Sequence, residues 1–118
     1  MDLTDSEKEQ LKQLARQSIE SVLYRKAIPA FKPTELLREK RGAFVTLTRK
    51  GELRGCIGYI QAILPLHDTI KEMAIQAAFR DPRFNPLQSN EWKEIDIEIS
   101  VLSPLERIRD INEIEVGV

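Results

Sequence analysis

The chain has 118 residues, of which 42% are hydrophobic and 31% are charged, and its net charge is −1. This composition is typical of one globular domain with a real core, and it excludes a disordered chain. No apolar stretch reaches the roughly 20 residues of a membrane-spanning helix, and the acidic start is unlike a signal peptide. We therefore expect a cytoplasmic protein without membrane contact.

The first predicted element is an amphipathic helix over about residues 5–25. Thr4 and Glu7 have the spacing of a capping box, in which the side chain of each residue accepts a hydrogen bond from the backbone N–H of the other. Apolar and small residues follow at helical spacing, namely Leu11, Leu14, Ala15, Ser18, Ile19, Val22 and Leu23.

Two prolines interrupt the chain after this helix. Pro29 and Pro33 cannot continue a helix, so residues 27–33 are predicted to form an extended connector. One helical turn is predicted after it, over residues 35–40.

A β-hairpin is predicted next, with strands over residues 42–48 and 52–60. The first segment is rich in β-branched and aromatic residues, and Lys50-Gly51 supplies the turn. Cys56 lies in the second strand between two glycines, which predict that this strand bulges or ends there.

A second helix is predicted from Pro65 to Arg80, because proline suits a first helical turn and apolar residues recur along one face. Two prolines in residues 81–86 then predict a structured loop. The clearest strand alternation covers residues 95–101, and a further alternation begins at residue 114 and runs to the C-terminus. Together these elements predict an α+β fold, with a mostly antiparallel sheet and flanking helices.

Charge is unevenly distributed along the chain. Residues 38–54 carry six basic and two acidic side chains, whereas residues 91–115 carry eight acidic and three basic ones. Either the two segments face each other or are solvated, or the basic segment is a binding face for nucleic acid or an acidic protein.

The single cysteine, Cys56, is the first candidate for catalysis. A thiol reacts as its thiolate, which a nearby cation such as Arg54 favours. The backbone N–H groups of Gly55 and Gly58 are unobstructed by side chains and are candidates for binding an anionic ligand. The alternative is that Cys56 is simply a small buried hydrophobic residue.

Arg80 and Arg83 are candidates for completing this site. They either complement the helix dipole, with Asp81 holding the turn, or form an anion-binding pair that faces the Cys56 loop. Cys56 and His67 together supply two ligands at most where structural zinc needs about four, so we predict no metal and no cofactor.

Other polar and aromatic residues have structural interpretations. We interpret His67 as a surface or capping residue, and Trp92 and Phe84 as core or lid residues rather than stacking platforms. Asp96 and Glu98 are interpreted as a solvated strand face rather than a metal or proton-transfer site.

Three segments resemble the AMMECR1 domain family. They are Leu53-Arg54-Gly55-Cys56-Ile57-Gly58, the run from Ala77-Ala78-Phe79-Arg80-Asp81-Pro82 through Arg83-Phe84-Asn85-Pro86-Leu87, and Ile97-Glu98-Ile99-Ser100-Val101-Leu102-Ser103-Pro104. The resemblance implies an α+β domain whose candidate site is the first of these segments. It also implies a step in a modification pathway shared with Memo-like and radical-SAM proteins, or a role with nucleic acid.

The resemblance predicts a single AMMECR1-like domain over residues 1–118. Family domains continue beyond the position of Val118, so we expect this one to be incomplete at its C-terminus. A terminal strand without a neighbour would then favour self-association.

Three functions follow. The first is a small-ligand or enzymatic site built from Arg54, Gly55, Cys56 and Gly58 and completed by Arg80 and Arg83, with the reaction left open. The second is a non-enzymatic binding module that uses residues 38–54. The third is a structural domain that binds a protein partner in a larger assembly.

Overall fold

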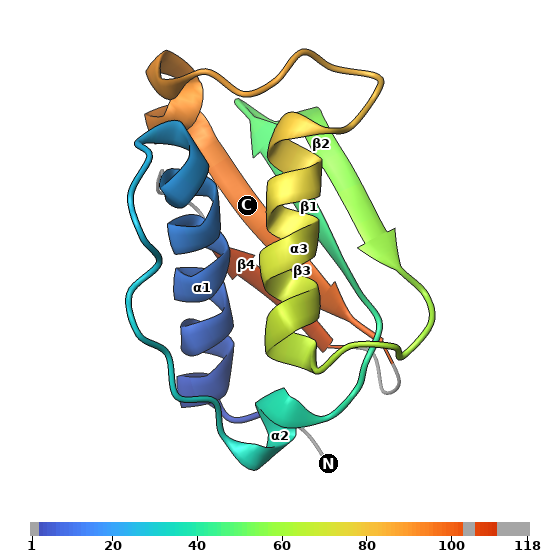
Figure 1. The fold of residues 1–118 in the computed structure, drawn as a ribbon. Helices are drawn as coiled ribbons and strands as arrows, with labels where there is room; N and C mark the ends of the chain where they lie inside the picture. Colours follow the sequence, from blue (N-terminus) through green and yellow to red (C-terminus); the bar gives the residue numbers. More distant parts are fainter. Residues whose placement is uncertain (1–2, 103–105, 111–118) are drawn as a thin grey trace.

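The computed structural model describes residues 3–102 and 106–110. In chain order these form α1 (Asp5–Leu23), α2 (Glu35–Arg38), β1 (Ala43–Arg49), β2 (Glu52–Tyr59), α3 (Leu66–Phe79), the 3-10 helix η1 (Ser89–Glu94), β3 (Ile95–Val101) and β4 (Glu106–Asp110). The strands pair antiparallel in the order β2-β1-β3-β4. Helices α1 and α3 lie side by side over one face of this sheet (Figure 1). The predicted α+β class is confirmed.

Helix α1 begins at the predicted cap. The Glu7 N–H donates to Thr4 Oγ1 at 3.1 Å, and Glu7 Oε1 accepts the Thr4 N–H at 2.9 Å. Its apolar stripe is buried against the sheet and α3. The helix ends at Leu23, two residues earlier than predicted, and Arg25 then adopts a positive φ of 53°.

The core lies between the two long helices and the inner face of the sheet. In β1 and β3 every second side chain is buried, including Val45, Leu47, Ile97 and Ile99, with at most 1% exposure. Small side chains on α3, such as Ala74, allow the helix to approach the sheet closely. In β1 and β3, the half-exposed residues that alternate with the buried ones form the opposite face of the sheet, which no described helix covers (Figure 1).

The hairpin between β1 and β2 contains a tight turn and a bulge. Lys50 and Gly51 both have positive φ, 53° and 82°, as a two-residue type I′ turn requires. Pairing then shifts from Thr48 opposite Leu53 to Leu47 opposite Gly55, which leaves Arg54 as the extra residue. The predicted irregularity is therefore a bulge at Arg54, and β2 continues through the glycines to Tyr59.

Two elements were not predicted. The helix η1 follows the proline-rich loop, and β4 pairs with β3 although Ile108 is the one apolar residue among its five. Such a short polar strand has no readable alternation. The alternation predicted from residue 114 lies outside the described residues.

Strand β2 and helix α3 touch through their backbones at Gly55. A Cβ atom at Gly55 would lie 2.1 Å from the carbonyl oxygen of Ala77. Gly55 is buried at this contact, so glycine is the residue that allows the strand to lie this close to the helix.

We therefore expect Gly55→Ala to lower the free energy of unfolding by about 3 kcal/mol, because the added methyl forces β2 and α3 apart. Urea denaturation measures this change. Gly51→Asn is the matched control: the turn is open, with no atom within 4 Å of a Cβ, and asparagine tolerates positive φ. Equal stability of the two variants would contradict the close contact.

Candidate functional site

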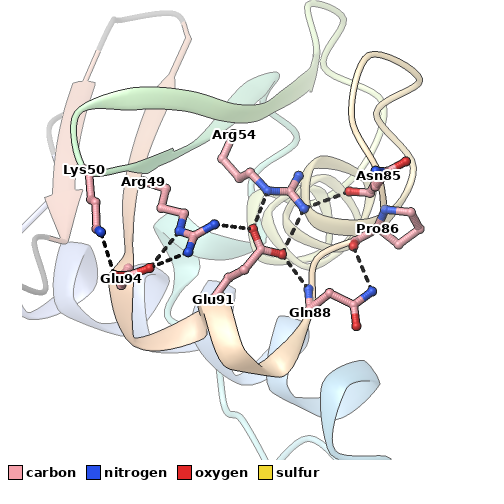
Figure 2. A network of polar contacts seen from close by, with 8 residues as sticks. All are labelled: Arg49, Lys50, Arg54, Asn85, Pro86, Gln88, Glu91 and Glu94. Carbon is pink, nitrogen blue, oxygen red and sulfur yellow. Dashed lines mark hydrogen bonds and ion pairs between the residues drawn. The ribbon is translucent and has the colours of Figure 1, made fainter.

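Arg54 makes an ion pair with Glu91 of η1. Its Nε donates to Glu91 Oε1 at 2.8 Å and its Nη2 to Oε2 at 3.2 Å (Figure 2). Nη2 also donates to the Asn85 carbonyl at 2.8 Å. Both side chains are largely buried, at 13% and 11% exposure, so the bulge residue of β2 is fixed to the loop and helix that follow α3.

The ion pair continues into a network along the hairpin. Arg49 contacts Glu91 at 3.3 Å and Glu94 at 2.7 Å, and Lys50 contacts Glu94 at 3.3 Å (Figure 2). Hydrogen bonds from Arg54 lower the pKa of Glu91 against the opposing effect of its burial. Hydrogen bonds from Arg49 and then Lys50 lower the pKa of Glu94. Residues 49–54 of the basic segment therefore face residues 91–94 of the acidic segment.

Asp81 and Arg83 cover the outer edge of β2 at Cys56. The Cys56 N–H donates to Asp81 Oδ2 at 3.0 Å, and Arg83 Nη2 lies 3.4 Å from the Cys56 carbonyl oxygen. Arg83 also donates from Nε and Nη2 to Asp81, at 3.0 and 2.7 Å. These bonds, with Arg83 contributing most, hold the pKa of the buried Asp81 well below its usual range.

The Cys56 thiol is half-buried on β2, beside β1. Its Sγ lies 3.1 Å from Thr46 Oγ1, the residue opposite it in the sheet. His67 is placed elsewhere: its ring packs against Phe31 at 5.8 Å, and Nδ1 lies 3.4 Å from Asp68. The contacts of the thiol therefore include a hydroxyl group rather than the imidazole.

The other predicted site residues have different positions. Gly55 is enclosed by α3, and a Cβ at Gly58 would lie 2.5 Å from the Ala43 carbonyl and the Phe44 ring, so close packing explains both glycines. Arg80 is exposed at the C-terminal end of α3. Of the two predicted arginines, Arg83 contacts the Cys56 backbone.

A cavity of about 350 Å³, here called the Arg54 pocket, adjoins the ion pair. Phe84 lies in its wall. The guanidinium carbons of Arg54 and Arg83 lie 5.9 and 5.5 Å from the centre of the Phe84 ring. Buried Arg54 Nη1 has no hydrogen-bond partner among the described residues. The pocket is lined by Arg54, Phe84, Asn85, Pro86, Gln88 and Glu91.

Sequence reasoning missed Glu91 and Thr46. Glu91 accepts the N–H of Gln88 at 2.9 Å, and this spacing of three residues at a helix start was the one available signal. Thr46 meets the thiol only through strand pairing. Trp92 is buried as predicted, and its Nε1 donates to Glu20 at 3.0 Å.

Metal-ligand clusters and membrane-spanning helices are both absent from residues 3–102 and 106–110. No group of three His, Cys, Asp or Glu side chains there could hold a metal ion, and Asp96 and Glu98 remain a half-exposed pair on one strand face. None of the described helices has the length and apolar character needed to cross a membrane.

We expect Asp81→Asn to lower the free energy of unfolding by about 2 kcal/mol at neutral pH, because a buried acceptor of several hydrogen bonds loses its charge. The folded protein depresses the pKa of Asp81. This stabilisation is thus complete above the unfolded value of about 3.9 and is lost as pH falls towards the folded value. The gap in urea stability between the two proteins should therefore close on acidification.

Asp5→Asn, on the exposed first turn of α1, is the matched control and should change stability little at any pH. A gap for Asp81→Asn that stays constant from neutral to strongly acidic pH would contradict the charge effect.

Comparison with known proteins agrees with this architecture. The AMMECR1 family model matches residues 12–118. A protein of Methanopyrus kandleri is 45% identical over 125 aligned positions, covering 98% of this chain and 60% of the relative. One of Methanosarcina barkeri is 43% identical over 111 positions, covering 90% and 55%.

A solved structure has the same fold. The crystal structure of an uncharacterised protein from Pyrococcus horikoshii aligns with a TM-score of 0.77 and 40% identity, covering 84% of this chain and 52% of that one. The chain thus spans about half the length of the relatives it matches. The resemblance found in its motifs is confirmed: this chain belongs to the AMMECR1 family.

Proposed function

We propose that this chain binds a small molecule in the Arg54 pocket, beside the Leu53–Gly58 motif. The observation that carries the proposal is the buried Arg54 Nη1, a charged donor without a partner among the described residues, on a side chain that lines a cavity. Leaving such a donor unsatisfied is costly, and a ligand oxygen would remove that cost. The cavity is within the size range of small-molecule sites, about 300–1,000 Å³.

The network defines the chemistry of this ligand. Glu91 Oε1 accepts from Arg54 and Arg49, and Oε2 accepts from Arg54 and the Gln88 N–H. Its carboxylate is therefore already satisfied, whereas Nη1 of Arg54 points away from it (Figure 2). Phe84 offers a flat apolar surface. The ligand expected here is a flat molecule that carries a carboxylate or carbonyl acceptor.

We propose Cys56 as a reactive thiol of the Leu53–Gly58 motif, outside the residues that line the Arg54 pocket. It follows Arg54 by two residues, and the Thr46 hydroxyl at 3.1 Å can donate to a thiolate. An enzymatic step in the modification pathway implied by the family resemblance stays a prediction, as does a protein partner.

The contacts favour this function over nucleic-acid binding. Three of the basic side chains in residues 38–54, Arg49, Lys50 and Arg54, are ion-paired with η1. A fourth, Arg41, is buried and donates to the Leu102 carbonyl at 3.0 Å. Paired charges release few counterions on meeting a phosphate backbone, so the segment is a weak polyanion site.

Benzoate is a suitable probe of the Arg54 pocket. We expect it to shift the side-chain amide signals of Asn85 and Gln88 in 15N-resolved NMR titrations, with Kd on the order of 1 mM for a molecule of this size. Arg54→Lys keeps the charge but removes the guanidinium fork, so Kd should rise at least about tenfold.

Arg49→Lys is the matched control, because Arg49 shares the ion-pair network without lining this pocket. It should leave the benzoate affinity within about twofold of the wild type. Thermal unfolding establishes that both variants are folded. Absence of a saturable shift at Asn85 and Gln88, or equal effects of the two substitutions, would remove the proposal.

Iodoacetamide tests Cys56 independently. We expect the folded chain to be alkylated without denaturant, because the residue Cys56 is partly exposed. Thr46→Val should slow the reaction several-fold at fixed pH, since it removes the hydroxyl beside Sγ while keeping a β-branched side chain of similar shape. Mass spectrometry gives the rates, with urea-unfolded protein as the reference. Labelling only after unfolding would show that Cys56 is an inert packing residue.

A further inference from the structure

A second cavity lies between α1 and the connector that follows it. It has a volume of about 390 Å³ and is here called the α1 pocket. Gln10, Gln13 and Gln17 line it from the helix, and Pro29 and Phe31 line it from the connector. It shares no residue with the Arg54 pocket.

The polar lining of the α1 pocket is short of a hydrogen-bond donor. Gln10 Oε1 is buried and has no partner among the described residues. Its neighbour Gln13 is differently placed, because its Oε1 accepts from Gln17 Nε2 at 3.4 Å. A buried amide oxygen without a donor destabilises the protein by itself, and a ligand N–H would relieve that cost.

The charge and shape of the pocket lining further limit the class of ligand that fits. The charged residue in the pocket wall is Glu9, whose side chain is 62% exposed and whose carboxylate contacts Lys12 at 3.1 Å. Its sign favours a cationic or neutral donor over an anion. Phe31 presents an aromatic ring that is positioned by the hydrophobic core and by His67. Flat unsaturated groups pack well against such a ring.

We propose that the α1 pocket binds a flat ligand that carries N–H donors, such as an amidine, a guanidine or an amide attached to an unsaturated group. The donors bond to Gln10 Oε1 and face Glu9, and the flat part packs against Phe31. Glu9 and Gln10 precede the residues that the family model matches, whereas Gln13, Gln17, Pro29 and Phe31 lie within them. The proposal does not depend on the function of the Arg54 pocket.

Benzamidine and benzoate form a matched pair of probes, because they share a ring and differ in donor or acceptor character and in charge. In NMR titrations of the full chain, benzamidine should shift the side-chain amide signals of Gln10 and Gln17 and the backbone signal of Phe31. We expect a Kd on the order of 1 mM. Benzoate should bind at these residues at least about tenfold more weakly.

Gln10→Leu removes the acceptor at similar size and should raise the benzamidine Kd about tenfold. Gln61→Leu, an exposed position outside both pockets, is the control and should leave Kd unchanged. If Gln10→Leu fails to fold, the comparison of the two probes on the wild-type chain still decides. Equal shifts by both probes, no saturable shift near Gln10, or an unchanged Kd in folded Gln10→Leu would overturn the proposal.

Discussion

The backbone of β2 lies directly against α3 at Gly55, and this contact brings the loop after α3 to the Leu53–Gly58 motif. Because no side chain separates the two elements, the end of α3 reaches the outer edge of β2. Asp81 can then accept the N–H of Cys56, and the loop that follows can meet the bulged Arg54. A local choice of glycine thus determines where a loop more than twenty residues away is held.

The same close contact between β2 and α3 allows the charged side chains near the motif to form ion pairs. Both guanidinium groups near the motif are held by carboxylates, Arg54 by Glu91 and Arg83 by Asp81. These contacts replace an open electropositive surface with an ordered scaffold. Among the described residues, Arg54 Nη1 alone of this guanidinium group has no hydrogen-bond partner, and the recognition that we propose here depends on it. Specificity in such a site comes from hydrogen-bond geometry more than from net charge.

The sequence predicted most features that depend on near neighbours, although the local helix η1 was missed. The helices and the strand alternation follow from periodicity and caps, and the motif located Arg54 and Cys56. It did not predict the partners, because Glu91 lies 37 residues from Arg54 and Thr46 lies 10 from Cys56. The bulge at Arg54 depends on strand register, and β4 has a single buried apolar side chain among the described ones, so neither leaves a readable pattern.

Strand β2 lies at the edge of the sheet formed by the described strands, and an exposed strand edge can pair with a strand from another molecule. Here a carboxylate and a guanidinium occupy the backbone groups of Cys56 that an incoming chain would need. Intermolecular pairing at this point would strip Asp81 of a partner while leaving it enclosed. The loop that shapes the pocket therefore also occupies the strand edge at Cys56.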